Sequence, residues 1–249
     1  MKPTNNLITN RAGKGAAVAV ALAGIAIPSS QAIVIVTDSF SMAPNSTLNI
    51  EDNALIIRHA DSAAATANYA LIYAHLSRGI NLASSGWWDG VGTGAGGAIQ
   101  SSNAALTAAT NSKGVGAIIN DYQGSPVTAT FFGVAVGLTD ILVRFTWEGD
   151  ADLDGLVTPT DQFLLDDNFL NNANSLFGWL NGDFDYQSDF VTPTDQFVLD
   201  SAVSEGGGVN PPLVGGGKSG GVVPEPGSIA LLALGAIGCL NRRFGRGAK

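Results

Sequence analysis

Residues 150–161 form a stretch in which acidic residues recur with the spacing of a calcium-binding loop. Carboxylates occupy its first, third, fifth and twelfth positions, and Gly155 stands at the sixth, where such a loop turns sharply. Carboxylates held this close repel one another and lose hydration, and a divalent cation offsets both costs. The sequence therefore predicts a Ca²⁺ site. Its expected ligands are the side chains of Asp150, Asp152, Asp154 and Asp161 and the backbone carbonyl of Leu156.

A ten-residue segment at the end of this loop occurs twice in the chain. Residues 157–166 recur as residues 191–200 with nine of ten positions identical, which indicates two copies of one structural unit. Each copy is predicted to begin a helix. Thr158 and Thr192 are the expected N-caps, each followed by a proline at the first helical position and an aspartate two residues further on.

The loop before the second copy matches the calcium pattern less well. Asp183 and Asp185 begin it, but Gln187 and Ser188 replace the usual acidic residue and glycine. Counted to its final aspartate, this loop is also one residue longer than the first. Two interpretations stay open: a distorted calcium site, or a loop that has lost its ion and keeps only the helix. The expected ligands of such a site are Asp183, Asp185, Asp189 and Asp195.

The charge distribution favours metal cations over nucleic acids as partners. Residues 33–222 contain five basic and 20 acidic residues, a net charge of −15. A nucleic-acid-binding surface needs the opposite sign. Residues 145–217 contain 13 acidic residues and no basic one, so no salt bridge within this segment can neutralise the loops.

The two ends of the chain have the composition of targeting segments. Residues 1–32 combine a basic start, an apolar run and the small-residue cleavage site Ser30-Gln31-Ala32, which predicts a signal peptide. At the other end, a Gly/Pro linker over residues 206–222 leads to Pro224-Glu225-Pro226. A short apolar run, residues 229–240, and an arginine cluster follow.

This order of features over residues 223–249 resembles the PEP-CTERM sorting signal. The resemblance implies export, a transient inner-membrane anchor through a short transmembrane segment, and processing near the motif by an exosortase-type protease. The apolar run is shorter than the roughly 20 residues of a permanent span. The alternative is an ordinary C-terminal anchor with the same topology.

Residues 33–149 are expected to form a β-rich module with one or two helices. Alternation of apolar and polar residues predicts one strand, and the face shared by Tyr69, Ile72 and Leu76 predicts one helix. The expected elements are a strand over 141–147, a partner strand over 127–136, a hairpin within 48–57, and helices over 61–78 and 102–110. With a small all-α calcium-binding module over 150–205, the predicted fold class is α+β.

The two loop-plus-helix units resemble a dockerin module, an EF-hand-type pair without entering helices. The resemblance implies contact with a cohesin-like partner through Pro159, Thr160, Pro193 and Thr194, although proline departs from the usual polar pair. The segment in front resembles a module of planctomycete-type exported proteins. The residues that carry this second resemblance are 55–57, 88–90, 99–102 and 139–145.

These features predict an exported, calcium-binding cell-surface or extracellular-matrix protein, non-catalytic and structural or adhesive. A surface polysaccharide is a candidate partner, since Trp87 and Trp88 could stack on a sugar ring. No acid–base pair of carboxylates can be nominated for an enzyme. The alternative is a docking subunit that binds a cohesin-like partner in a polysaccharide-degrading assembly.

Overall fold

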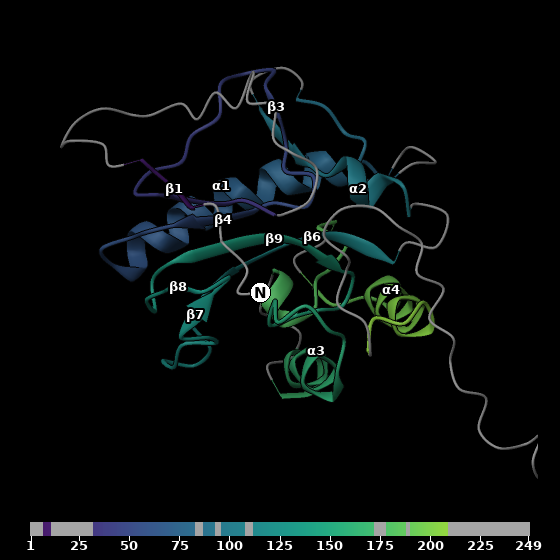
Figure 1. Ribbon diagram of the computed structural model, residues 1–249. Helices are drawn as coiled ribbons and strands as arrows, with labels where there is room; N and C mark the ends of the chain where they lie inside the picture. Colours follow the sequence, from purple (N-terminus) through teal and green to yellow (C-terminus); the bar gives the residue numbers. More distant parts are fainter. Residues whose placement is uncertain are drawn as a thin grey trace, which may run out of the picture. The chain divides into compact units, whose positions relative to one another are not determined.

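The computed structural model describes residues 7–10, 32–82, 87–92, 96–107, 112–171, 178–187 and 190–208. Its centre is a five-stranded mixed sheet with the order β1-β2-β4-β9-β6 (Figure 1). These strands are β1 (Leu7–Asn10), β2 (Val34–Thr37), β4 (Ala54–Ile57), β9 (Ile141–Trp147) and β6 (Lys113–Ile119). The first three run parallel, and β9 runs antiparallel to both of its neighbours.

Helix α1 (Ser62–Ile80) confirms the helix predicted over 61–78. Asp61 caps its start by accepting a hydrogen bond from the backbone N–H of Ala64 at 2.8 Å, and Asn81 ends it in the left-handed conformation. Tyr69, Ile72 and Leu76 are buried, as their spacing predicts. Figure 1 shows α1 on one face of the sheet, with α3 (Pro159–Asn171) and α4 (Pro193–Ser204) on the other.

Strand β9 confirms the strand predicted over 141–147, but the predicted partner is wrong. Residues 127–136 contain a separate small hairpin of β7 (Thr130–Phe131) and β8 (Val134–Ala135). The long partner is β6, whose two glycines disfavour a strand by composition. Both are required by packing: a Cβ on Gly114 would lie 2.1 Å from the Glu148 carboxylate, and one on Gly116 would lie 2.4 Å from Leu153.

The hairpin predicted within 48–57 is also wrong. Strand β3 (Thr47–Asn49) pairs in parallel with β5 (Ala98–Gln100), whereas β4 pairs with β2 and β9. All four residues of β4 are buried. A strand that is apolar on both faces belongs inside a sheet with two partners, which a local hairpin cannot supply. The short helix α2 (Ser102–Ala105) confirms the start of the helix predicted over 102–110.

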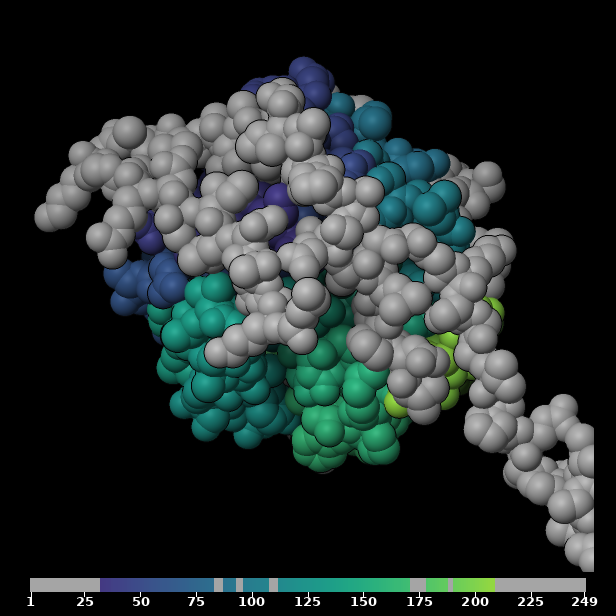
Figure 2. Space-filling model, viewed as in Figure 1, coloured from purple at the N-terminus to yellow at the C-terminus, as the bar shows by residue number. Residues whose placement is uncertain are grey.

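The predicted α+β arrangement with a separate all-α calcium module is wrong. The fold is mixed α/β, and one hydrophobic core contains Ile118 and Val143 of the sheet together with Leu165 and Val198 of the repeats and Trp179, which lies between the repeats. The repeats pack their apolar faces onto the sheet because Gly116 leaves room for Leu153 and Trp179. Figure 2 shows the surfaces of the β7–β8 region and of α3 adjoining one another.

The outer edge of β6 is covered by two tyrosines from different parts of the chain. Tyr69 of α1 donates its hydroxyl to the carbonyl of Ala117, and Tyr186 donates to that of Val115, each at 2.9 Å. These carbonyls point to the side of β6 that has no strand partner. Buried backbone acceptors need such partners, so the tyrosines complete the sheet edge.

None of the helices among the described residues is long and apolar enough to cross a membrane. The predicted signal peptide, apart from the backbone of β1 and Ala32, and the predicted sorting tail lie outside the described residues.

Candidate metal centre

The first loop brings three predicted ligands together. Carboxylate oxygens of Asp150, Asp152 and Asp154 lie within 4.8 Å of one another. Asp150 is fully buried: its Oδ2 accepts hydrogen bonds from the Gly155 N–H and the Thr146 hydroxyl, and its Oδ1 has no partner. A buried carboxylate oxygen without a donor is the arrangement that a cation can complete.

Asp161 closes the first loop rather than joining this group. Its Oδ1 accepts the backbone N–H of Ala151 at 2.8 Å and that of Asp152 at 3.3 Å, and its Oδ2 accepts that of Thr158 at 2.7 Å. The last of these bonds lies at the start of α3, as in the predicted capping arrangement. The same carboxylate therefore fixes both the beginning of the loop and the beginning of its helix.

The second loop repeats this geometry through its first five residues. Asp195 accepts N–H bonds from Phe184 and Asp185 at 2.7 and 3.2 Å, as Asp161 does in the first loop. The Gln187 N–H donates to Asp185 at 2.9 Å, as the Asp154 N–H donates to Asp152 at 3.1 Å. The backbone also takes the same left-handed turn, with φ 53° at Tyr186 and 59° at Leu153.

The second loop also gathers three carboxylates, although the sequence left its function open. Asp183, Asp185 and Asp195 have oxygens within 4.8 Å of one another, and all three are buried. Asp183 Oδ2 accepts the Tyr73 hydroxyl at 2.6 Å, while Oδ1 has no partner. The extra residue falls after Gln187, where Ser188 and Asp189 lie outside the described residues.

The electrostatics of both loops disfavour their ionised carboxylates in the absence of a cation. Burial, together with the charges of neighbouring aspartates, raises the pKa of Asp183 to about 8 and those of Asp152 and Asp185 to about 6. Burial likewise raises the pKa of Asp150 well above its usual value. A bound dication would reverse this preference because it stabilises the charged form.

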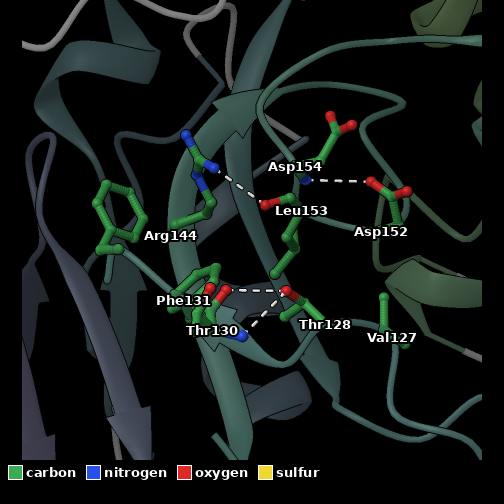
Figure 3. A pocket seen from close by; sticks show the side chains of 9 residues that line it. Val127, Thr128, Thr130, Phe131, Arg144, Asp152, Leu153 and Asp154 are labelled. Atoms are coloured by element: carbon green, nitrogen blue, oxygen red, sulfur yellow. Dashed lines mark hydrogen bonds between the residues drawn. The ribbon is translucent and has the colours of Figure 1, made fainter. Parts of the chain in front are cut away.

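One basic residue approaches the first loop from the sheet. The Nη1 of Arg144 on β9 donates to the Leu153 carbonyl at 3.0 Å, and its guanidinium lies 4.7 Å from the centre of the Phe132 ring. Figure 3 shows the Arg144 side chain directed at this carbonyl, with Asp152 and Asp154 nearby. Burial lowers the pKa of Arg144, and the charges of these aspartates oppose that change. The sequence did not predict this contact, because Arg144 precedes the acidic segment.

A shallow pocket of about 400 Å³ opens between the first loop and the β7–β8 hairpin. Its lining residues are Val127, Thr128, Thr130, Phe131, Phe132, Arg144, Asp152, Leu153 and Asp154.

Glu148 is a second residue that sequence reasoning missed. It is fully buried, its Oε1 accepts the indole N–H of Trp88 at 2.9 Å, and its Oε2 has no partner. Burial raises its pKa well above the usual value, and the charges of Asp185 and Asp195 raise it further. The sequence gives only an indirect indication of this buried carboxylate: the glycine at position 114, which leaves space for the Glu148 side chain.

Two further sets of predicted residues have clear positions. The residues expected to contact a partner, Pro159, Thr160, Pro193 and Thr194, are all exposed at the starts of α3 and α4. Trp88 is 1% exposed, so the predicted stacking of this ring on a sugar is wrong.

The comparisons with known proteins bear on the C-terminal tail. The family model of the PEP-CTERM protein-sorting motif matches residues 222–246, which confirms the predicted sorting signal around Pro224-Glu225-Pro226. No curated protein and no solved structure matches the chain. The matched motif identifies the chain as an exported protein that is sorted to the cell surface through a C-terminal tail recognised in exosortase processing.

Proposed function

We propose that this surface-sorted protein is a non-catalytic structural or adhesive module whose fold is completed by two Ca²⁺ ions. The observation that carries the proposal is the pair of buried aspartates, Asp150 and Asp183. Each begins an acidic loop and has a carboxylate oxygen without a partner. Both loops share the same hydrogen-bond pattern, which supports the same role for both.

The chemistry of the donors fits calcium. A buried polar atom without a partner costs about 1–3 kcal/mol, and more when it is charged. Ca²⁺ takes six to eight oxygen ligands in a flexible geometry, so it suits loops that offer carboxylates and backbone carbonyls. In the first loop Asp150, Asp152, Asp154 and the Leu156 carbonyl would hold the ion, and Asp161 would keep the loop closed. In the second, Asp183, Asp185 and Asp195 would hold it.

The test is a calorimetric titration of the metal-free full chain with CaCl₂, together with melting curves in calcium and in chelator. Two bound ions per chain and a higher melting temperature in calcium are expected. Mg²⁺ is the matched control, since it demands a stricter octahedral geometry and should stabilise less. Folded protein that takes up no calcium at millimolar concentration would contradict the proposal.

A docking role is the second candidate, favoured by the exposure of matched residues at the two helix starts. Pro159 and Thr160 in the first repeat correspond to Pro193 and Thr194 in the second, and all are accessible to a partner. Capture of a cohesin-fold protein that is lost in the Thr160→Asp, Thr194→Asp double variant would support docking. Capture that survives both substitutions would place the contact elsewhere.

A further inference from the structure

We propose that Glu148, which lies between β9 and the first loop, is a ligand of a calcium ion in the second loop, reached through a bridging water. The inference rests on the proposed function, because it assigns a further residue to one of the two sites. It also bears on whether the second loop, whose sequence departs from the calcium pattern, can hold an ion.

The Glu148 carboxylate is held in one orientation with one oxygen to spare. Its Oε1 accepts the Trp88 indole N–H at 2.9 Å, while Oε2 is buried and has no partner. The side chain occupies space that only glycine at position 114 permits, since a Cβ there would lie 2.1 Å from Oε1. Such a fixed, fully buried acceptor requires a donor or a cation.

Glu148 is connected to the second loop through Trp88. The charges of Asp185 and Asp195 act on its carboxyl group, and both belong to the three-carboxylate group of that loop. The Trp88 ring that orients Glu148 also packs edge-on against Tyr186 of the same loop, with ring centres 6.1 Å apart. Glu148 is not one of the carboxylates within 4.8 Å of one another, which is why we assign it a water-bridged position.

Glu148 would add a buried carboxylate to the second site. The fifth position of the first loop is Asp154, and the equivalent residue of the second loop is the neutral Gln187. Glu148 would join the three grouped carboxylates of Asp183, Asp185 and Asp195 in place of a carboxylate at that position. Water-bridged carboxylates are an ordinary part of calcium loops, and outer-sphere partners of this kind affect metal affinity strongly.

The test uses Glu148→Gln, which keeps the shape and an oxygen for the Trp88 N–H but removes the charge. The two sites are separated by titrating in two backgrounds: Asp154→Ala, which weakens the first site, and Asp185→Ala, which weakens the second. Glu148→Gln should lower calcium affinity about 10–100-fold in the Asp154→Ala background. It should leave affinity unchanged in the Asp185→Ala background, and the exposed control Glu51→Gln should change neither.

A rescue experiment keeps the proposal testable even where Glu148→Gln alone folds poorly. Gln187 is exposed, so Gln187→Asp should fold normally and place a carboxylate at the fifth position of the second loop, as Asp154 does in the first. It should raise the affinity of the second site in the chain with Glu148 and recover the loss in the Glu148→Gln, Gln187→Asp double variant. Unchanged affinity in Glu148→Gln, or a loss that Gln187→Asp does not recover, would overturn the assignment. A wild-type chain that binds no calcium would overturn the proposed function as well.

Discussion

The side-chain amides of Gln162 and Gln196 hydrogen-bond to each other in both directions, with Nε2–Oε1 distances of 3.0 and 3.1 Å. The two residues occupy the same position in the two repeats. Each also donates to the aspartate four residues later, Asp166 or Asp200, at 2.9 Å. A reciprocal contact between equivalent residues is what an approximate twofold axis produces, so the repeats are related by local twofold symmetry.

The glycines before the two loops obey the same symmetry and give a first prediction. A Cβ on Gly149 would lie 2.9 Å from Leu199 of α4, and one on Gly182 would lie 2.9 Å from Leu165 of α3. Gly149→Ala should cost about 1–2 kcal/mol for its positive φ and about 1–3 kcal/mol for overpacking. The control is Gly124→Ala. Gly124 has φ +85° and nothing within 4 Å of an added Cβ, so this substitution should cost only the stability lost to the positive φ. If urea unfolding shows the same loss of stability in both variants, the close contact between Gly149 and Leu199 is contradicted.

A second prediction compares the fifth position of the two loops. Asp154 lies in the carboxylate group of the first loop, whereas its counterpart Gln187 is neutral and exposed. Asp154→Ala should therefore reduce the calcium-induced rise in melting temperature more than Gln187→Ala does. Melting curves in calcium and in chelator measure both shifts, and the opposite ranking would contradict the assignment of Asp154 as a ligand.

A third prediction concerns pH in the metal-free chain. Burial raises the pKa of Asp183 to about 8 and those of Asp152 and Asp185 to about 6, against about 3.9 in an unfolded chain. The folded chain therefore binds more protons than the unfolded chain between about pH 4 and pH 8, and its stability should fall as pH rises through that window.

Calcium should remove this fall, because it competes with protons for the same oxygens. Melting temperatures at pH 5 and pH 8, each with chelator and with saturating calcium, give the comparison. A metal-free chain that becomes more stable toward pH 8 would show that these carboxylates are not buried as described.

A fourth prediction tests how the second loop is fixed to the sheet. Tyr186→Phe keeps the ring that stacks on Trp179 but removes the hydroxyl that bonds the Val115 carbonyl. The free energy of unfolding should fall by about 1 kcal/mol, the typical net value of one buried hydrogen bond. Urea unfolding in saturating calcium measures it, and an unchanged value would show that the edge of β6 does not need this donor.

Local patterns allowed part of this structure to be predicted from the sequence. Alternating side chains revealed β9, and Asp61 with a one-sided apolar stripe revealed α1. The aspartate spacing marked the first loop. Each of these signals lies within a short stretch of chain, where neighbouring residues determine the structure.

The remaining features depend on contacts between distant residues. Strand β6 was not predicted because Gly114 and Gly116 disfavour a strand. Glycine is needed at these positions to leave room for the side chains of Glu148 and Trp179. All four residues of β4 are buried, so its sequence shows no alternation of apolar and polar residues from which its partner strands could be predicted. Arg144 and Glu148 reach the loops only through the folded sheet, so no sequence spacing within the loops could have identified them.

Trp179 and Tyr186 lie in the same hydrophobic core as β6, which makes the second loop inseparable from the sheet. Because these two side chains are buried with the sheet, we expect this part of the chain to open together with the core. Backbone amides of β6 and α4 should accordingly exchange with deuterium at similarly slow rates. Removal of the proposed ion should therefore destabilise β6 as well as the second loop.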